Sequence, residues 1–187
     1  MSDQLIETDL ANYSIPHYDH GSVLRRIAWF ILGNVFINSY LPIPVKLKVL
    51  FLRIFGAKIG KGLIIKPKVN IKYPWLLTVH DHVWIGEEVW IDNLVEVTLG
   101  SHVCLSQGAM LLTGNHDFTK SSFDLFTGKI VLEKGVWIGA KAVVCPGVSC
   151  GSHAVLGISS VAASNLDSYT IYRGNPAIRV KNREITQ

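Results

Sequence analysis

The sequence is poor in cysteine and in charge. Its three cysteines, Cys104, Cys145 and Cys150, are odd in number and lack the CxxC spacing of a redox or zinc motif. We therefore expect free thiols in a reducing compartment and no disulfide framework. Charged residues make up only 17% of the chain against 49% hydrophobic residues, and no low-complexity tract occurs. This balance excludes intrinsic disorder and favours one globular domain, because 187 residues can bury a sizeable core.

Two other features are missing. No basic run alternates with aromatic residues, so the sequence does not predict a nucleic-acid-binding surface. The net charge of +4 and the pI near 9.0 are still compatible with an anionic ligand or a membrane surface. The first ten residues, MSDQLIETDL, are acidic and contain no charged segment followed by an apolar one. We therefore expect no signal peptide and a cytoplasmic protein.

The N-terminal region divides into a polar arm and an apolar stretch. Residues 1–22 are polar, whereas no charged residue occurs between Arg26 and Lys46. That length raises the question of a membrane span, but two asparagines and two prolines within it argue against one. We predict that residues 1–55 form an arm and a helical cap on the domain that follows. Contact of residues 23–53 with a membrane surface is a second interpretation, which leaves the protein cytoplasmic but membrane-associated.

From Ile59 onward the sequence repeats every six residues. The fifth residue of each hexad is mostly apolar or small, and a two-residue insert after every third hexad makes a larger unit of 20 residues. The first residue is aliphatic nine times in succession: Ile59, Ile65, Ile71, Val79, Ile85, Ile91, Leu99, Leu105 and Leu111. A period of six does not match the 3.6 residues of a helical turn, so we predict short strands joined by tight turns and stacked in three-sided coils.

In such a coil the first-position residues point inward and stack as ladders along the core. Gly60, Gly86 and Gly100 directly follow inward residues. We expect a corner there, where either a small side chain or a positive φ is required.

The period breaks after His116 and resumes at Leu132. A loop of this length inside a compact repeat usually has a function, and its three phenylalanines, at 118, 123 and 126, either form a lid or anchor the loop. We predict a β-helix over residues 56–167 with a loop at 117–131. A C-terminal tail, residues 168–187, carries a GNPA turn followed by basic residues.

Several motifs together resemble those of the hexapeptide-repeat acyltransferases. They are the hexads, the TGNH before the loop, the segment GVWIGAKAVVCPGV and the tail YTIYRGNPA, and the likeness spans about residues 55–185. It is greatest to exopolysaccharide O-acetyltransferases of the colanic acid type, with maltose and galactoside acetyltransferases as more distant relatives. The resemblance implies an all-β solenoid, a left-handed parallel β-helix, whose handedness runs against the usual crossover rule. It also implies a homotrimer with acetyl-CoA bound between neighbouring subunits.

Transfer of an acetyl group from a thioester to a sugar hydroxyl needs a base for the hydroxyl proton, and histidine suits this task near neutral pH. Six of the seven histidines lie in the arm or at turn or outward hexad positions, where surface histidines are expected. His116 ends a coil, opens the loop and matches the catalytic histidine of the family motif. The alternative is a histidine that stabilises a turn.

A zinc site would need several histidines at the spacing of the coils. His82 and His102 are 20 residues apart and stack, but His116 is out of that register, so we predict no metal site.

The resemblance also implies that a polar residue one coil before the histidine contacts the acceptor or orients the histidine, without settling which residue does so. Asp92 and Asn93, one coil before His116, replace the usual glycine-containing corner with polar side chains, and Asn115 lies in the TGNH motif. All three are acceptor candidates, and ordinary polarity at a surface turn is the alternative for the first two.

For acetyl-CoA the resemblance implies contacts with small residues along the pantetheine arm and with a cation at the phosphates. The candidates are Ala140, Ile158, Ala163, Ser164 and Lys181. For Lys181, an ordinary basic tail is the alternative interpretation.

We therefore predict an acetyl-CoA-dependent O-acetyltransferase that acts on a sugar hydroxyl of a surface or exopolysaccharide unit, by direct transfer with His116 as general base. One alternative is an N-acetyltransferase acting on an amino sugar. Alternatives from other classes are a zinc enzyme of the carbonic anhydrase type and a non-catalytic trimeric scaffold.

Overall fold

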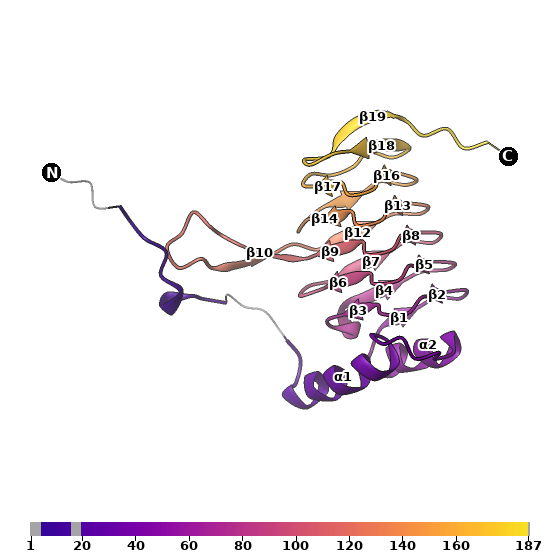
Figure 1. Ribbon diagram of the computed structural model, residues 1–187, viewed down its shortest axis with the longest axis horizontal. Coiled ribbons are helices and arrows are strands. Elements are labelled where there is room, and N and C mark those ends of the chain that lie inside the picture. The colour runs from indigo at the N-terminus through magenta and orange to yellow at the C-terminus, as the bar shows by residue number, and fades with distance from the viewer. Residues whose placement is uncertain (1–4, 16–19, 187) are drawn as a thin grey trace.

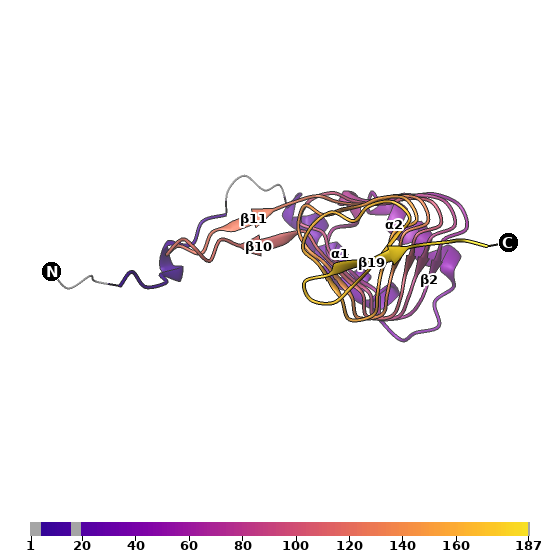
Figure 2. The same ribbon diagram turned by 90° about the horizontal axis from the view of Figure 1, so that it is seen from above.

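The computed structural model describes residues 5–15 and 20–186. The rest of the expected arm, residues 1–4 and 16–19, lies outside the described residues, as does Gln187 at the end of the expected tail. The described chain forms a three-sided solenoid of parallel strands with two helices at its N-terminal end and a hairpin that projects from its side (Figures 1 and 2). The predicted all-β solenoid with a helical cap is confirmed.

Each face of the solenoid is one parallel sheet. Face A consists of β1 (Lys58–Ile59), β4 (Leu77–Val79), β7 (Val97–Leu99), β12 (Ile130–Leu132) and β15 (Ser149–Cys150). Face B consists of β2 (Ile64–Ile65), β5 (Trp84–Ile85), β8 (Cys104–Leu105), β13 (Trp137–Ile138), β16 (Val155–Leu156) and β18 (Thr170–Arg173), followed by antiparallel β19 (Ile178–Asn182). Face C consists of β3 (Asn70–Ile71), β6 (Trp90–Asp92), β9 (Met110–Leu112), β14 (Val143–Val144) and β17 (Val161–Ala162).

The hexad ladders form as predicted. Ile65 pairs in register with Ile85, and Ile91 with Leu111, so that equivalent hexad positions lie one above another. All nine first-position residues from Ile59 to Leu111 are buried, with exposures of 8% or less. The ladders form one apolar core along the solenoid axis, and this core positions everything outside it.

At the glycine corners the first of the two expected reasons applies. Gly86 has no positive φ, and a small side chain is required because a Cβ there would lie 2.9 Å from the backbone of the next coil. The left-handed backbone instead recurs at the fourth position of the hexad. There it is adopted by Lys68, His82, Glu88, His102, Lys141, His153, Ser159 and Tyr169 among the non-glycine residues. The hexad period locates the inward side chains but carries no information on the sign of φ.

The cap consists of α1 (Val23–Phe36) and α2 (Val45–Ile54). The first coil has no coil beneath it, so some of its carbonyl groups lack a strand partner. Side chains of the cap donate to one carbonyl on each face. Arg53 donates to Ile59 O at 2.7 Å on face A, Lys48 to Lys66 O at 3.2 Å after face B, and Trp29 Nε1 to Ile71 O at 2.8 Å on face C. The cap therefore closes the open end of the solenoid by hydrogen bonds as well as by apolar packing.

At the other end, the expected tail does not leave the solenoid at residue 168. Strand β18 extends face B because Thr170 and Tyr172 point inward, and β19 then folds back against it. Short helical turns occur at Leu10–Asn12 and Pro74–Leu76. Within residues 5–15 and 20–186, no helix combines the length and the apolar character needed to cross a bilayer.

Candidate active site

The phase break of the repeat is an antiparallel hairpin. Strand β10 (Gly114–His116) pairs with β11 (Leu125–Thr127), His116 lying opposite Leu125. The projecting segment therefore begins before the expected loop at 117–131, and Ile130 already belongs to face A. At its base Thr113 is fully buried, donates its hydroxyl to Asp92 O at 2.9 Å and accepts from Leu94 N at 2.7 Å. This residue, which the sequence did not single out, fixes the point where the chain leaves the coil.

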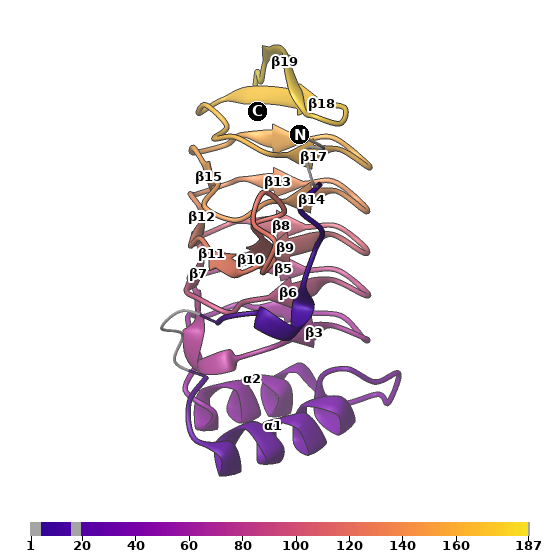
Figure 3. The same cartoon turned by 90° about the vertical axis from the view of Figure 1, so that its left-hand side faces the viewer.

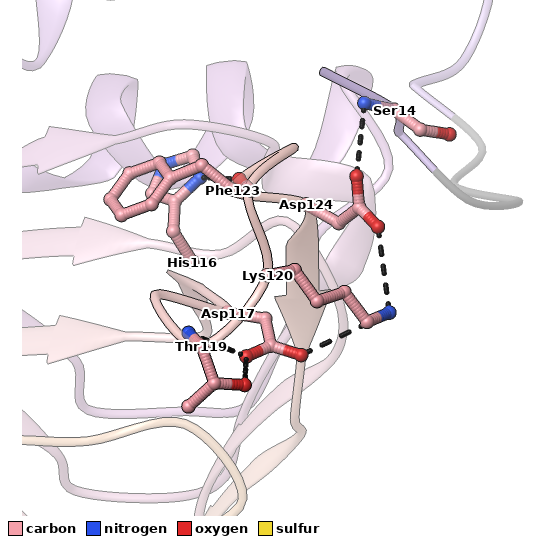
Figure 4. Close-up of polar contacts among 7 residues, drawn as sticks. All are labelled: Ser14, His116, Asp117, Thr119, Lys120, Phe123 and Asp124. Atoms are coloured by element: carbon pink, nitrogen blue, oxygen red, sulfur yellow. Dashed lines mark hydrogen bonds and ion pairs between the residues drawn. The ribbon is translucent and has the colours of Figure 1, made fainter. Parts of the chain in front are cut away.

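The His116 ring is held on two sides. Its Nδ1 lies 3.0 Å from the carbonyl oxygen of Phe123, and the two rings stack with centroids 4.6 Å apart (Figure 4). A carbonyl oxygen only accepts hydrogen bonds, so the neutral imidazole carries its hydrogen on Nδ1 and leaves the Nε2 lone pair available. Phe123 has a positive φ of 52°, the conformation in which its carbonyl is presented to the ring. The expected role of this phenylalanine as lid or anchor thus takes the form of a contact with the histidine.

Hydrogen bonds and ion pairs of charged residues stabilise the tip of the hairpin (Figure 4). Asp117 accepts hydrogen bonds from the hydroxyl and the backbone N–H of Thr119, and these bonds lower its pKa below the usual value. Lys120 lies between Asp117, at 3.9 Å, and Asp124, at 3.5 Å. A hydrogen bond from the hydroxyl of Ser122 is the largest cause of the lowered pKa of Asp124. The tip is therefore ordered around ionised carboxylates.

The N-terminal arm lies along the hairpin (Figures 1 and 3). Asp9 N donates to Ser121 O at 2.8 Å, and Ser14 N donates to the Asp124 carboxylate at 3.2 Å. The Tyr13 ring then packs against His116, with centroids 5.7 Å apart. Tyr13 was not predicted, because a contact between residues a hundred positions apart leaves no local signal in the sequence.

The three acceptor candidates lie in different surroundings. Asn93 is fully buried, and its amide accepts from Tyr73 N at 3.0 Å and donates to Tyr73 O at 2.6 Å. Asp92 points outward from β6, pairs with Lys72 at 2.9 Å and lines a cavity of about 810 Å³ between α1 and face C. Asn115 is exposed, and its side chain accepts from His116 N at 2.8 Å. Asn115 is therefore hydrogen-bonded to His116, whereas the amide of Asn93 is hydrogen-bonded to the backbone within the coils.

The cofactor candidates lie towards the C-terminal end of the solenoid. Ala140 and Ile158 line a groove of about 820 Å³, whose other walls include Trp137, Arg173 and Arg183. Ala163, Ser164 and Lys181 are exposed but do not line this groove.

The sequence did not single out Arg183, which donates to the carbonyl groups of Gly135 and His153 from this edge of the coils. The groove combines an apolar wall with two guanidinium groups, an arrangement suited to a ligand with an apolar arm and anionic groups.

Within one chain the hairpin and the groove point in different directions. The hairpin projects from one side of the solenoid, whereas the groove residues flank β13 and β16 on face B, at the opposite side (Figures 1 and 2). His116 is not among the residues that line the groove.

Metal-assisted catalysis and catalysis by a cysteine nucleophile are two other chemistries that can be compared with the side chains present. The described residues contain no cluster of three or more His, Cys, Asp or Glu arranged to hold a metal ion. The three cysteines are free, as predicted, and burial raises the pKa of the Cys150 thiol to about 12. A thiol with so high a pKa is a poor nucleophile near neutral pH.

Comparison with known proteins places these features in context. No family model matches the sequence. WcaF of Escherichia coli (strain K12), named as a colanic acid biosynthesis acetyltransferase, is 34% identical over 181 residues, which are 96% of this chain and 99% of WcaF.

Solved structures share the fold. The hexapeptide-repeat acetyltransferase VCA0836 of Vibrio cholerae, in complex with acetyl-CoA, superposes with a TM-score of 0.80 at 22% identity, covering 90% of this chain and 94% of that one. A maltose O-acetyltransferase from Clostridium difficile 630 gives a TM-score of 0.75 at 20% identity, covering 87% and 88% of the two chains. The predicted left-handed parallel β-helix is thereby confirmed.

Proposed function

The chain belongs to the hexapeptide-repeat acetyltransferases, and from this premise we propose that it transfers the acetyl group of acetyl-CoA to a hydroxyl of a sugar in the synthesis of a surface or extracellular glycan. The near full-length similarity to WcaF supports a glycan acceptor. The acetyl-CoA complex of VCA0836 and the name of the maltose enzyme support acetyl-CoA as co-substrate and a sugar hydroxyl as acceptor. The observation that carries the proposal is the His116 ring, fixed by Phe123 with its Nε2 available on a projecting hairpin.

In this mechanism His116 is the general base. The acceptor hydroxyl oxygen attacks the thioester carbonyl carbon while Nε2 takes the hydroxyl proton. The tetrahedral intermediate then collapses, the carbon–sulfur bond breaks, and the proton passes from Nε2 to the departing CoA sulfur. The hydrogen bond from Nδ1 to the Phe123 carbonyl holds the tautomer and stabilises the imidazolium formed on the way. Direct transfer needs no covalent intermediate on the protein.

The acceptor side of the site is proposed to involve Asp92 and Asn115. Asn115 adjoins the base, and Asp92 presents an outward carboxylate at the wall of the cavity beside face C. A carboxylate is a strong acceptor for sugar hydroxyl groups. For Asn93 we propose a structural role in joining two coils instead of contact with the acceptor, because both hydrogen-bonding ends of its buried amide are occupied by the backbone of Tyr73.

On the cofactor side, Ala140 and Ile158 are proposed to contact the pantetheine arm in their groove, and the exposed positions of Ala163, Ser164 and Lys181 to extend that contact. The groove of one copy and the hairpin of the next would then complete one site in a homotrimer. Support for this assembly comes from the divergent directions of hairpin and groove within a single chain.

The base is tested by His116→Ala, with His80→Ala as a matched control at an exposed histidine outside the proposed site. CoA release from acetyl-CoA is measured with a panel of free and lipid-linked sugars. His116→Ala is expected to lower the rate roughly 10²- to 10⁴-fold, and His80→Ala to leave it unchanged. An O-acetyl product is cleaved by mild alkali and an N-acetyl product is not, which separates the two acceptor classes. Undiminished CoA release in His116→Ala would refute the assignment.

The shared site is tested by complementation. His116→Ala destroys the hairpin half and Ala140→Trp fills the groove half, so each variant alone is expected to be inactive. When both are co-expressed, mixed trimers contain sites built from two intact halves and regain activity. Continued inactivity of mixed particles, whose composition is verified by mass spectrometry, would place both halves in one chain.

A further inference from the structure

One face of α1 is apolar and exposed among the described residues, and four of its side chains, Val23, Ile27, Phe30 and Ile31, also line the cavity beside face C. Trp29 and Gly33 on the opposite side are buried against the first coil, and the indole of Trp29 donates to Ile71 O. The exposed side chains recur at helical spacing, Leu24 being 81% and Phe30 72% exposed, and they form one stripe that we call the α1 face: Val23, Leu24, Ile27, Phe30, Ile31 and Val35. Exposed Leu50 and Ile54 on α2 add to the apolar surface of the same end.

Charge is distributed very unevenly along the chain. Residues 20–80 contain ten of the 18 Lys and Arg residues and none of the 14 Asp and Glu residues. Three of these cations have backbone partners, since Arg25, Lys48 and Arg53 donate to carbonyl groups of the cap junction and the first coil. In the part of the chain that the structure describes, Lys72 is the only one of the ten that pairs with a carboxylate.

The remaining cations give the cap end a positive surface. Lys46 on α2 is exposed, and so are three lysines of the first coil, at positions 58, 61 and 66. The cap and the first coil lie together at one end of the solenoid, opposite β19 (Figure 1). This end therefore combines an exposed apolar helix face with exposed lysines. Asp81 on the next coil is the carboxylate that lies beside Lys61.

We propose that this end of the protein docks on an anionic lipid bilayer, with the α1 face inserted at the boundary between headgroups and acyl chains. A helix with one large apolar face and basic surroundings is the type of element that lies in that interface, and anionic headgroups complement the lysines. A second copy of the chain fits less well, because a symmetric contact through the α1 face brings the two basic ends together. The positive charge around the α1 face thus favours an anionic bilayer over a second copy of the chain as the partner of this surface.

Docking in this orientation has a consequence for the acceptor, which rests on the function proposed above. Strands of neighbouring coils are about 4.8 Å apart, and a helix layer is about 10 Å thick. Strand β9, which leads into the hairpin, is two coils beyond β3. His116 would then lie on the order of 20 Å from the headgroups, within reach of a glycan carried on a lipid.

Vesicle sedimentation of the full-length protein tests the docking without using catalysis. Vesicles of phosphatidylcholine alone are compared with vesicles that also contain phosphatidylglycerol. We expect binding to the anionic vesicles at least tenfold stronger than to the neutral ones, and weaker binding as salt is raised. The variant Ile27→Ser/Phe30→Ser/Ile31→Ser is expected to lose at least 90% of the bound fraction. A matched control, Ile178→Ser/Val180→Ser/Ile185→Ser, removes three exposed apolar side chains at the other end and is expected to bind as the wild type does.

Three outcomes would overturn the proposal. They are wild-type protein that stays in the supernatant with anionic vesicles, an α1-face variant that binds undiminished, and an α1-face variant in which the number of copies per particle changes in light scattering. The last result would show that another copy covers the face. Far-UV circular dichroism establishes that both triple variants are folded. Since no outcome depends on acetyl transfer, failure here is distinguishable from failure of His116 as the base.

Discussion

Asn93 offers a sharp test of how this fold uses buried polar groups. Its amide joins two coils by two hydrogen bonds to the backbone of Tyr73, and its side chain is fully buried. Replacement by leucine keeps the volume close to that of asparagine but removes both bonds. The Tyr73 N–H then loses this partner in a partly buried position, whereas the Tyr73 C=O keeps its hydrogen bond from Leu76 N at 3.0 Å.

The expected cost follows from the two lost bonds. Leaving the Tyr73 N–H without its partner costs about 1–3 kcal/mol, and the bond lost at the still-paired C=O costs about 0.5–1.5 kcal/mol, so Asn93→Leu should destabilise the protein by about 1.5–4.5 kcal/mol. Each kcal/mol shifts Tm by about 2–4 °C in a chain of this size, so Tm should fall by at least about 3 °C.

The measurement is thermal unfolding at one fixed protein concentration, because assembly makes Tm depend on concentration. Asp92→Asn is the matched control. It breaks only the partly exposed ion pair with Lys72, which is worth about 0–1 kcal/mol, and it tests the acceptor contact through KM. The reasoning is refuted if Asn93→Leu keeps its Tm within 1 °C and instead raises KM for the acceptor, because the amide would then serve the substrate.

Four further predictions concern single side chains. Burial lowers the pKa of Lys48, so the unfolded chain binds this proton more tightly than the folded protein does. The stability of the wild type relative to Lys48→Met should therefore rise with pH up to the ordinary lysine pKa of 10.5. Urea unfolding at pH 7 and pH 10 measures this difference. Thr113→Val removes the hydroxyl at the hairpin base and should cost about 1–3 kcal/mol by the same assay. Gly86→Ala places a Cβ 2.9 Å from backbone atoms and should lower Tm, while Gly108→Ala, where the nearest atom is 3.4 Å away, should lower it less. Phe123→Ala removes the ring stacked on His116 and should lower kcat more than it changes KM for acetyl-CoA, and an equal effect on both would show a role in cofactor binding.

The core of this fold was predictable because its period is strict. Every first-position residue faces inward, and a six-residue spacing excludes a helix whatever the surroundings. The corners were not predictable to the same degree. His102 and Lys141 adopt a positive φ that gives no signal in their identity, since their side chains project away from the core and any residue without a branched Cβ is tolerated there.

The candidate site was predictable only in part. His116 stands out because it ends the period, but Tyr13 contacts it from a segment without any repeat. Asn93 looks like a polar turn residue in the sequence, and its burial becomes visible only once Tyr73 is placed on the coil beneath. Asn115 and the groove residues stay predictions until a ligand is bound.

The hydrogen bonds between the cap and the first coil have a consequence for how the protein behaves when it is damaged. A stack of parallel strands is open to growth at any uncovered edge, since an edge is a template for further strands. Helices α1 and α2 cover one edge here, and β19 covers face B at the other. Proteolytic loss of the helices would expose the strands of the first coil as a template for further strands, so we expect the truncated protein to self-associate more readily than the intact one.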